Sequence, residues 1–194
     1  MLFRSLAVAC RKRGVGCQIF ASDVFAAEVE RAHQMVSLCG EEFPEVSIGK
    51  VDASKMNEAL LFMGEESSLD GIVTDLPWGR RSLNHQTISK LYPAMLQVFY
   101  RMLKPGGCAL LMTAEQNNLI RAAKAHEAES RRRGYEWFLN VEQFNMTPCA
   151  NQNIYDPKSL KPAPTDEQRS ASVRTVHCGY YVSLVLLRKV PLIV

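Results

Sequence analysis

The chain has 194 residues, a hydrophobic fraction of 47% and a formal net charge of +3. This length predicts a single domain over residues 1–194 and gives no strong case for two. No apolar run approaches the ~20 residues of a membrane span, which argues against a membrane partner. The six cysteines are scattered, with no Cys-x-x-Cys pair. Neither a disulfide framework nor a bound metal is therefore expected, and a reducing compartment is favoured, the cytoplasm first and the nucleus second.

Helices and strands alternate along most of the chain. After a basic helix that ends at Gly14, short apolar runs indicate buried strands, and segments with apolar residues at helical spacing separate them. The predicted strands cover residues 17–21, 46–51, 71–74 and 108–113, and the predicted helices cover 24–39, 56–63, 87–103 and 117–133. Continuous apolar strands in such an alternation predict an open α/β sheet with helices on both faces.

The tail of the chain has a different pattern. Residues 136–145 and 173–189 are two strand-like segments with no helix between them, which predicts hairpin-like antiparallel strands at the edge of the sheet. Residues 147–172 carry four prolines and many polar side chains, a composition that predicts a long flexible loop.

Three consecutive predicted strands lead into an aspartate, namely Asp23, Asp52 and Asp75. Ligands of open α/β sheets bind outside the carboxyl ends of the strands. Aspartate is also common there as a turn former or helix N-cap, so each of the three taken alone is weak evidence for a site. Their common position favours a binding site over three unrelated turns.

The strongest signal is Asp75-Leu76-Pro77-Trp78-Gly79, which follows the apolar strand directly. A carboxylate and the backbone carbonyl behind it can accept both N–H bonds of an exocyclic amino group. The proline stiffens the turn, and the aromatic ring can stack on a planar base. The motif therefore predicts a site that holds a planar amine.

This motif and the segments around it resemble the catalytic half of the THUMP-domain tRNA guanosine-N2-methyltransferases, which are class I S-adenosylmethionine enzymes. The resemblance covers roughly residues 17–190. It is carried by residues 75–79, Arg80-Arg81, Leu91-Tyr92-Pro93, Lys104-Pro105-Gly106-Gly107 and Val176-His177-Cys178-Gly179. It implies a Rossmann-like sheet, S-adenosylmethionine as cofactor, and methylation of the exocyclic N2 amine of a guanosine in tRNA.

The resemblance also implies which residues hold the cofactor. Asp23 would bind the ribose, and Asp52 together with Ala53 would bind the adenine. Asp75 would lie where the transferable methyl group meets its acceptor, so it belongs to both the cofactor site and the catalytic site.

On the acceptor side, the resemblance implies four catalytic positions. The Asp75 carboxylate and the Leu76 carbonyl would accept hydrogen bonds from guanine N2, Pro77 would stiffen the turn, and Trp78 would stack on the base. The alternative for Trp78 is a buried core residue. The cations near the motif would neutralise RNA phosphates, with solvated surface residues as the alternative; they are Arg80, Arg81 and Lys90.

Two parts of the family pattern are not found in this sequence. The first is the THUMP region, and the second is the glycine-rich loop that follows the first strand and wraps the methionine end of the cofactor. Gly14-Val15-Gly16 is the only candidate for that loop, but it comes after a helix and before a strand, which is the reverse order. The expectation is a sheet without its first central strand, flanking strands with exposed inner edges, and weak binding of S-adenosylmethionine.

Two other functions remain open. The same motif geometry would serve another planar amine, such as adenine N6 or a glutamine amide, and a truncated non-catalytic isoform would act by binding alone. The partners that the resemblance implies are tRNA and a small zinc-containing activator subunit that covers an apolar face of the methyltransferase domain.

Overall fold

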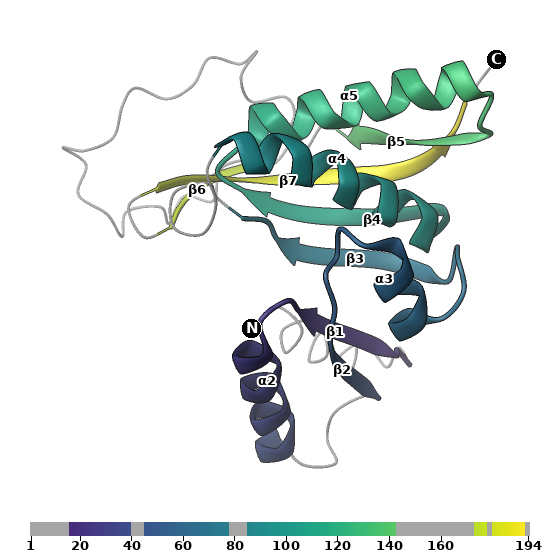
Figure 1. Ribbon diagram of the computed structural model, residues 1–194. Coiled ribbons are helices and arrows are strands. Elements are labelled where there is room, and N and C mark those ends of the chain that lie inside the picture. Colours follow the sequence, from purple (N-terminus) through teal and green to yellow (C-terminus); the bar gives the residue numbers. More distant parts are fainter. Residues whose placement is uncertain (1–15, 40–44, 78–84, 143–172, 178–179, 193–194) are drawn as a thin grey trace.

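The computed structural model describes residues 16–39, 45–77, 85–142, 173–177 and 180–192. The predicted amino-terminal helix and the predicted loop at 147–172 lie outside the described residues. The elements follow the expected alternation (Figure 1), and in chain order they are β1 (Ile19–Asp23), α2 (Ala26–Cys39), β2 (Val46–Lys50), α3 (Met56–Met63), β3 (Leu69–Asp75), α4 (His85–Met102), β4 (Leu103–Thr113), α5 (Gln116–Arg133), β5 (Trp137–Glu142), β6 (Val173–His177) and β7 (Tyr180–Pro191). No described helix is long and apolar enough to cross a membrane.

The larger of two sheets has the strand order β3-β4-β7-β5. β3 and β4 are parallel, and β7 runs antiparallel to both β4 and β5. β4 begins earlier than predicted, at Leu103, and its register against β3 shifts before Cys108, where the predicted strand begins. The expected antiparallel end of the sheet is confirmed: β5 is the outermost strand of this order, and β7 lies between β5 and β4.

The carboxyl-terminal segment 173–189, predicted as one strand, is two strands. β6 pairs with β7 in an antiparallel arrangement, and the register begins with His177 opposite Tyr180. The single-strand prediction was wrong because a continuous run of strand-forming residues does not show where the chain reverses.

The main core lies between the larger sheet and the helices α4 and α5, which cover one face of it (Figure 1). On α4, the apolar face predicted from helical spacing is confirmed, because Ile88, Met95, Phe99 and Met102 are all buried. Tyr92 on the same face is also buried. A buried tyrosine needs a partner for its hydroxyl group, and this one has partners at the candidate site.

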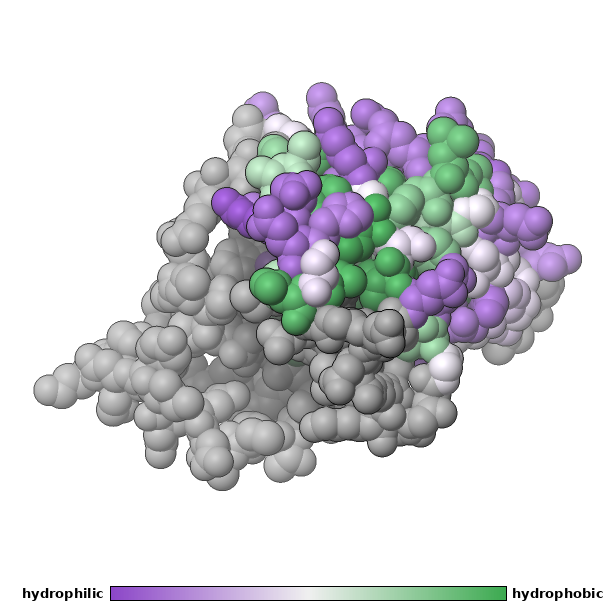
Figure 2. All heavy atoms as spheres, turned by 90° about the horizontal axis from the view of Figure 1, so that it is seen from below, coloured by the Kyte–Doolittle hydropathy of each residue, from purple (hydrophilic) through white to green (hydrophobic). Residues whose placement is uncertain are grey.

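β1 and β2 form a separate parallel pair, covered by α2. The face of α2 predicted to be apolar is only half-buried. Large apolar side chains near both ends of α2 are exposed, with Phe25 at 63% and Leu38 at 87%. Figure 2 views the molecule from this end and shows apolar side chains gathered between polar ones. Among the described strands, β1 pairs only with β2 and β3 only with β4, which agrees with the expected division of the sheet.

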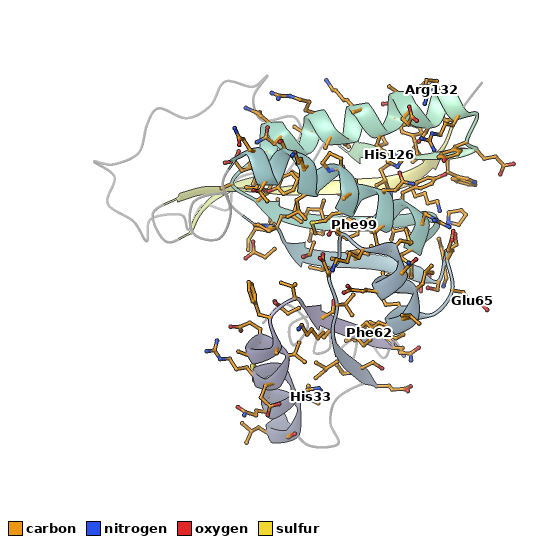
Figure 3. The ribbon with its side chains drawn as sticks, viewed as in Figure 1. His33, Phe62, Glu65, Phe99, His126 and Arg132 are labelled. Atoms are coloured by element: carbon orange, nitrogen blue, oxygen red, sulfur yellow. The ribbon has the colours of Figure 1, made fainter. Side chains whose placement is uncertain are left out.

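Helix α3, which has the predicted bounds, connects the two sheets. Its Ala59 is fully buried against α4. Its Phe62 points toward β1 and β2 (Figure 3), where the ring packs edge-on against Phe20 at a centroid distance of 5.8 Å. A Cβ atom on Gly49 would lie 2.4 Å from the Phe62 ring, so any larger residue at this point of β2 would force the ring to shift.

Candidate active site

The three predicted aspartates lie at the carboxyl ends of parallel strands. Asp23 and Asp75 are the last residues of β1 and β3, and Asp52 follows β2 by two residues. The arrows of β1, β2, β3 and β4 end on the same side of the molecule (Figure 1). The structure therefore places all three carboxylates where open α/β sheets bind ligands.

Asp23 forms the turn that leads into α2. Its Oδ1 accepts a hydrogen bond from the Phe25 amide at 2.9 Å, and its backbone carbonyl accepts one from the Val51 amide at 3.1 Å, which joins the ends of β1 and β2. Asp23 therefore does form a turn, which was one of the two roles considered for it from the sequence. Within the described residues, no hydrogen bond to the second carboxylate oxygen, Oδ2, is found.

Asp52 makes the same kind of turn with more partners. Its Oδ1 accepts hydrogen bonds from the Ser54 amide at 3.0 Å and from the Ser54 hydroxyl at 2.6 Å. Lys55 Nζ lies 3.6 Å from the other oxygen. The Ser54 hydroxyl, with a smaller contribution from Lys55, holds the pKa of Asp52 below its usual value, so the group is a carboxylate at neutral pH. No hydrogen bond to the neighbouring Ala53 amide is found in the described part of the chain.

The turn after β3 combines an exposed acid with a fixed backbone. Asp75 is exposed, whereas the next residue, Leu76, is 2% exposed and belongs to the main core. The Leu76 amide donates to the Met112 carbonyl of β4 at 2.8 Å. The Tyr92 hydroxyl of α4 lies 2.8 Å from the Pro77 carbonyl. The backbone behind the acid is therefore held by two separate elements.

The remaining predicted residues are less constrained by the structure. Trp78, Arg80 and Arg81 lie outside the described residues. Lys90 is exposed on α4, a position that suits a phosphate contact as well as a solvated side chain. The structure therefore places the strand-end acids on the same side of the molecule but does not test the RNA contacts.

Sequence reasoning assigned no role to Tyr92 or Thr113. Leu91-Tyr92-Pro93 entered only as part of the family resemblance, and the hydroxyl groups of Tyr92 and Thr113 lie 2.8 Å apart behind the turn. A tyrosine on the apolar face of a helix was the available signal, because its hydroxyl must find a partner when buried. The sequence did not indicate that this partner is the motif itself.

A match to a known protein family shows to which family this chain belongs. The family of RMKL-like methyltransferase domains matches residues 4–139, which is more than half of the chain. The chain belongs to this methyltransferase family. No curated protein matches it in sequence.

Solved structures show the same fold as this methyltransferase domain. TrmN from Thermus thermophilus has 16% identity and a TM-score of 0.58, over 95% of this chain and 40% of that one. A methyltransferase homolog from Pyrococcus horikoshii has 16% identity and a TM-score of 0.55, over 88% and 53% of the two chains. NSun6 from Pyrococcus horikoshii has 15% identity and a TM-score of 0.55, over 88% and 41%. The methyltransferase domain thus spans between 40% and 53% of these proteins.

At these identities the likeness establishes the fold, which is the Rossmann-like fold of class I methyltransferases. The family gives the cofactor, S-adenosylmethionine. The ends of β1 and β2 fit its nucleoside half, because each carries a carboxylate with one oxygen held by its own turn. The Ala53 amide beside Asp52, for which the described residues offer no acceptor, fits a ring nitrogen of the adenine.

Proposed function

We propose that this methyltransferase domain acts on the exocyclic N2 amine of a guanosine in tRNA. One observation carries the proposal: Asp75 is exposed at the carboxyl end of β3, directly before a buried backbone that β4 and α4 both hold. An exposed carboxylate next to a fixed carbonyl is a bidentate acceptor for a planar amine. The resemblance of residues 75–81 and 91–93 to the THUMP-domain family supports guanosine in tRNA as the acceptor.

S-adenosylmethionine supplies the methyl group. The Asp75 carboxylate and the Leu76 carbonyl accept the two N–H bonds of guanine N2 and direct its electron pair toward the methyl carbon. Asp75 or water would take the proton that the amine nitrogen releases when it is methylated. Positioning of this kind can contribute ~7–11 kcal/mol to the lowering of a barrier, so little acid–base catalysis is needed.

The other proposed residues bind the cofactor or the RNA and take no part in the reaction. Asp23 would hold the cofactor ribose, and Asp52 with Ala53 the adenine. Trp78 would stack on the unstacked guanine, an interaction worth ~1–3 kcal/mol per base. The cations proposed to contact RNA phosphates, which would make binding dependent on salt, are Arg80, Arg81 and Lys90.

Nucleoside mapping tests the proposal. The 194-residue chain would be incubated with unmodified tRNA and S-adenosylmethionine at millimolar concentration, so that weak cofactor binding does not hide activity. Mass spectrometry of the digested RNA is expected to find N2-methylguanosine, and heat-inactivated chain is the control. N6-methyladenosine instead would favour the other planar-amine hypothesis. Absence of any methylated nucleoside would contradict both guanine N2 and adenine N6 of tRNA as the acceptor.

A second candidate function is binding without catalysis, and the sheet gives it one specific support. Within the described residues no strand pairs with the remaining edges of β1 and β3.

We propose the small zinc-containing activator subunit as a partner of this methyltransferase domain. The exposed Phe25 and Leu38, near the two ends of α2, support an apolar contact. Co-purification of the two proteins, lost on changing both side chains to serine, would be the expected result.

A further inference from the structure

Tyr92 places a hydroxyl group inside the core, directly behind the proposed amine-binding turn. The residue is 1% exposed, and its oxygen lies 2.8 Å from the Pro77 carbonyl and 2.8 Å from Thr113 Oγ1. Thr113, the last residue of β4, is fully buried. Its Oγ1 in turn accepts a hydrogen bond from the Glu115 amide at 2.8 Å.

The number of available protons fixes the direction of this chain of hydrogen bonds. A carbonyl oxygen can only accept, so the single hydroxyl proton of Tyr92 is donated to Pro77. The hydrogen bond between the two side chains then requires Thr113 to donate to Tyr92. The Thr113 oxygen remains an acceptor for the Glu115 amide. Only this arrangement of protons gives each oxygen in this series of hydrogen bonds a partner.

This arrangement holds the turn from the side opposite to the exposed acid. The Leu76 amide is bound to the Met112 carbonyl, and the Pro77 carbonyl is bound to Tyr92. The two residues that follow Asp75 are therefore anchored to β4 and to α4. Reacting groups must be placed closely, because a displacement of ~1 Å can cost on the order of 10²-fold in rate.

We propose that Tyr92 is a positioning residue for methyl transfer: oriented by Thr113, its hydroxyl holds the Pro77 carbonyl and so fixes the Asp75–Leu76 acceptor pair. The catalytic part of this inference rests on the proposed function. Its structural part, that Tyr92 stabilises the turn, does not.

Burial alone does not explain a hydroxyl at this position. Leu96 and Phe99 fill the same core from the same helix without a polar atom, and a buried hydroxyl is unfavourable unless it is hydrogen-bonded. Burial also raises the pKa of Tyr92 to about 12, so the hydroxyl keeps its proton throughout the neutral pH range. The donor to Pro77 is thus present under all conditions in which the enzyme would work.

The test compares variants that remove one hydroxyl group. Tyr92→Phe removes the donor to Pro77, Thr113→Val removes the group that orients it, and Thr113→Ser retains that group. Tyr100→Phe is the matched control, because Tyr100 is eight positions later on the same helix and its ring packs against His126 and Tyr135, away from the turn.

Two quantities would be measured in each variant: hydrogen exchange of the Leu76 amide, and the kcat and KM for tRNA. For Tyr92→Phe and for Thr113→Val we expect roughly tenfold faster exchange and a kcat lowered about 10–100-fold. The KM and the cofactor Kd should change little, and the double variant should be no worse than either single one. Thr113→Ser and Tyr100→Phe should resemble the unchanged chain.

Unchanged exchange and kcat in Tyr92→Phe would overturn the proposal, and so would an equal effect in Tyr100→Phe. The proposed function can fail separately. If the unchanged chain forms no N2-methylguanosine, that function is wrong, and the exchange of the Leu76 amide alone decides whether Tyr92 holds the turn.

Discussion

Asp23 and Asp52 show how one aspartate can form a turn and still be available to a ligand. Each accepts a backbone amide two residues ahead through Oδ1, at 2.9 Å and 3.0 Å. The apolar runs before them predicted where they lie, because a buried strand ends where polar residues begin. Their bonds could not be predicted, because these depend on the backbone angles of the residues that follow.

His126 is a half-buried titratable group on α5 that packs against neighbouring side chains. Its ring packs against Tyr100 at a centroid distance of 4.9 Å, and its Nδ1 lies 3.4 Å from the Ser130 hydroxyl. No hydrogen-bond partner for the buried Nε2 is found among the described residues. Burial lowers the pKa of His126, because a charged imidazole would lose its hydration there.

This shift predicts a pH-dependent stability. As pH falls through the usual histidine range, the unfolded chain takes up the proton before the folded chain does, so the free energy of unfolding decreases. Denaturant titrations from about pH 7.5 to pH 5.5 should show a smaller decrease in His126→Gln than in the unchanged chain. Parallel pH dependence of the two proteins would rule out this role. Hydrogen bonds lower the pKa values of Asp52, Glu58 and Glu129, whose contributions are lost only at more acidic pH.

Among the elements, the contact between β2 and α3 depends most on one residue. Gly49 lets the Phe62 ring approach the strand, and this ring also contacts Phe20 of β1. The β1–β2 pair is joined to the rest of the molecule partly through this packing, because α3 also packs on α4 through Ala59.

Gly49→Ala should therefore be destabilising. The new Cβ would meet the Phe62 ring at 2.4 Å, and relieving such overpacking typically costs about 1–3 kcal/mol of unfolding free energy. Gly16→Ala is the matched control, since nothing lies within 4 Å of the added Cβ. Chemical denaturation would measure both variants, and equal stability of the two would show that the ring moves without cost.

The helices were easier to predict than the tail. Helical spacing and terminal glycines placed α3 at its observed bounds and α5 within one residue. The tail failed because strand pairing is not local. Lys189 illustrates this: it was expected near the end of a strand, yet it is 5% exposed, with Nζ donating to the Leu103 carbonyl at 2.8 Å. No pattern near Lys189 identifies a partner more than 80 residues away.

At the scale of the whole molecule, the sequence predicted the fold and the edge that carries the site, because alternation and strand-end acids are read directly from it. The hydrogen bonds that join Thr113 and Tyr92 to the Pro77 carbonyl could not be predicted, because they depend on how α4 packs over β4. Among the described residues, β1–β2 and the larger sheet are separate, and the missing central strand stays a prediction. Weak binding of the cofactor by this chain stays a prediction.

The most direct test of the amine-binding role compares two aspartates on β3. Asp75→Asn removes the proposed acceptor charge, and Asp70→Asn is the control, because exposed Asp70 pairs with Lys104 near the start of the strand. The measurement is the rate of N2-methylguanosine formation in tRNA at saturating cofactor. Hydrogen bonds to charged groups contribute ~1.5–3 kcal/mol, so Asp75→Asn should be about 10–100-fold slower. Asp70→Asn should match the unchanged chain. Equal rates for the two variants would contradict the account.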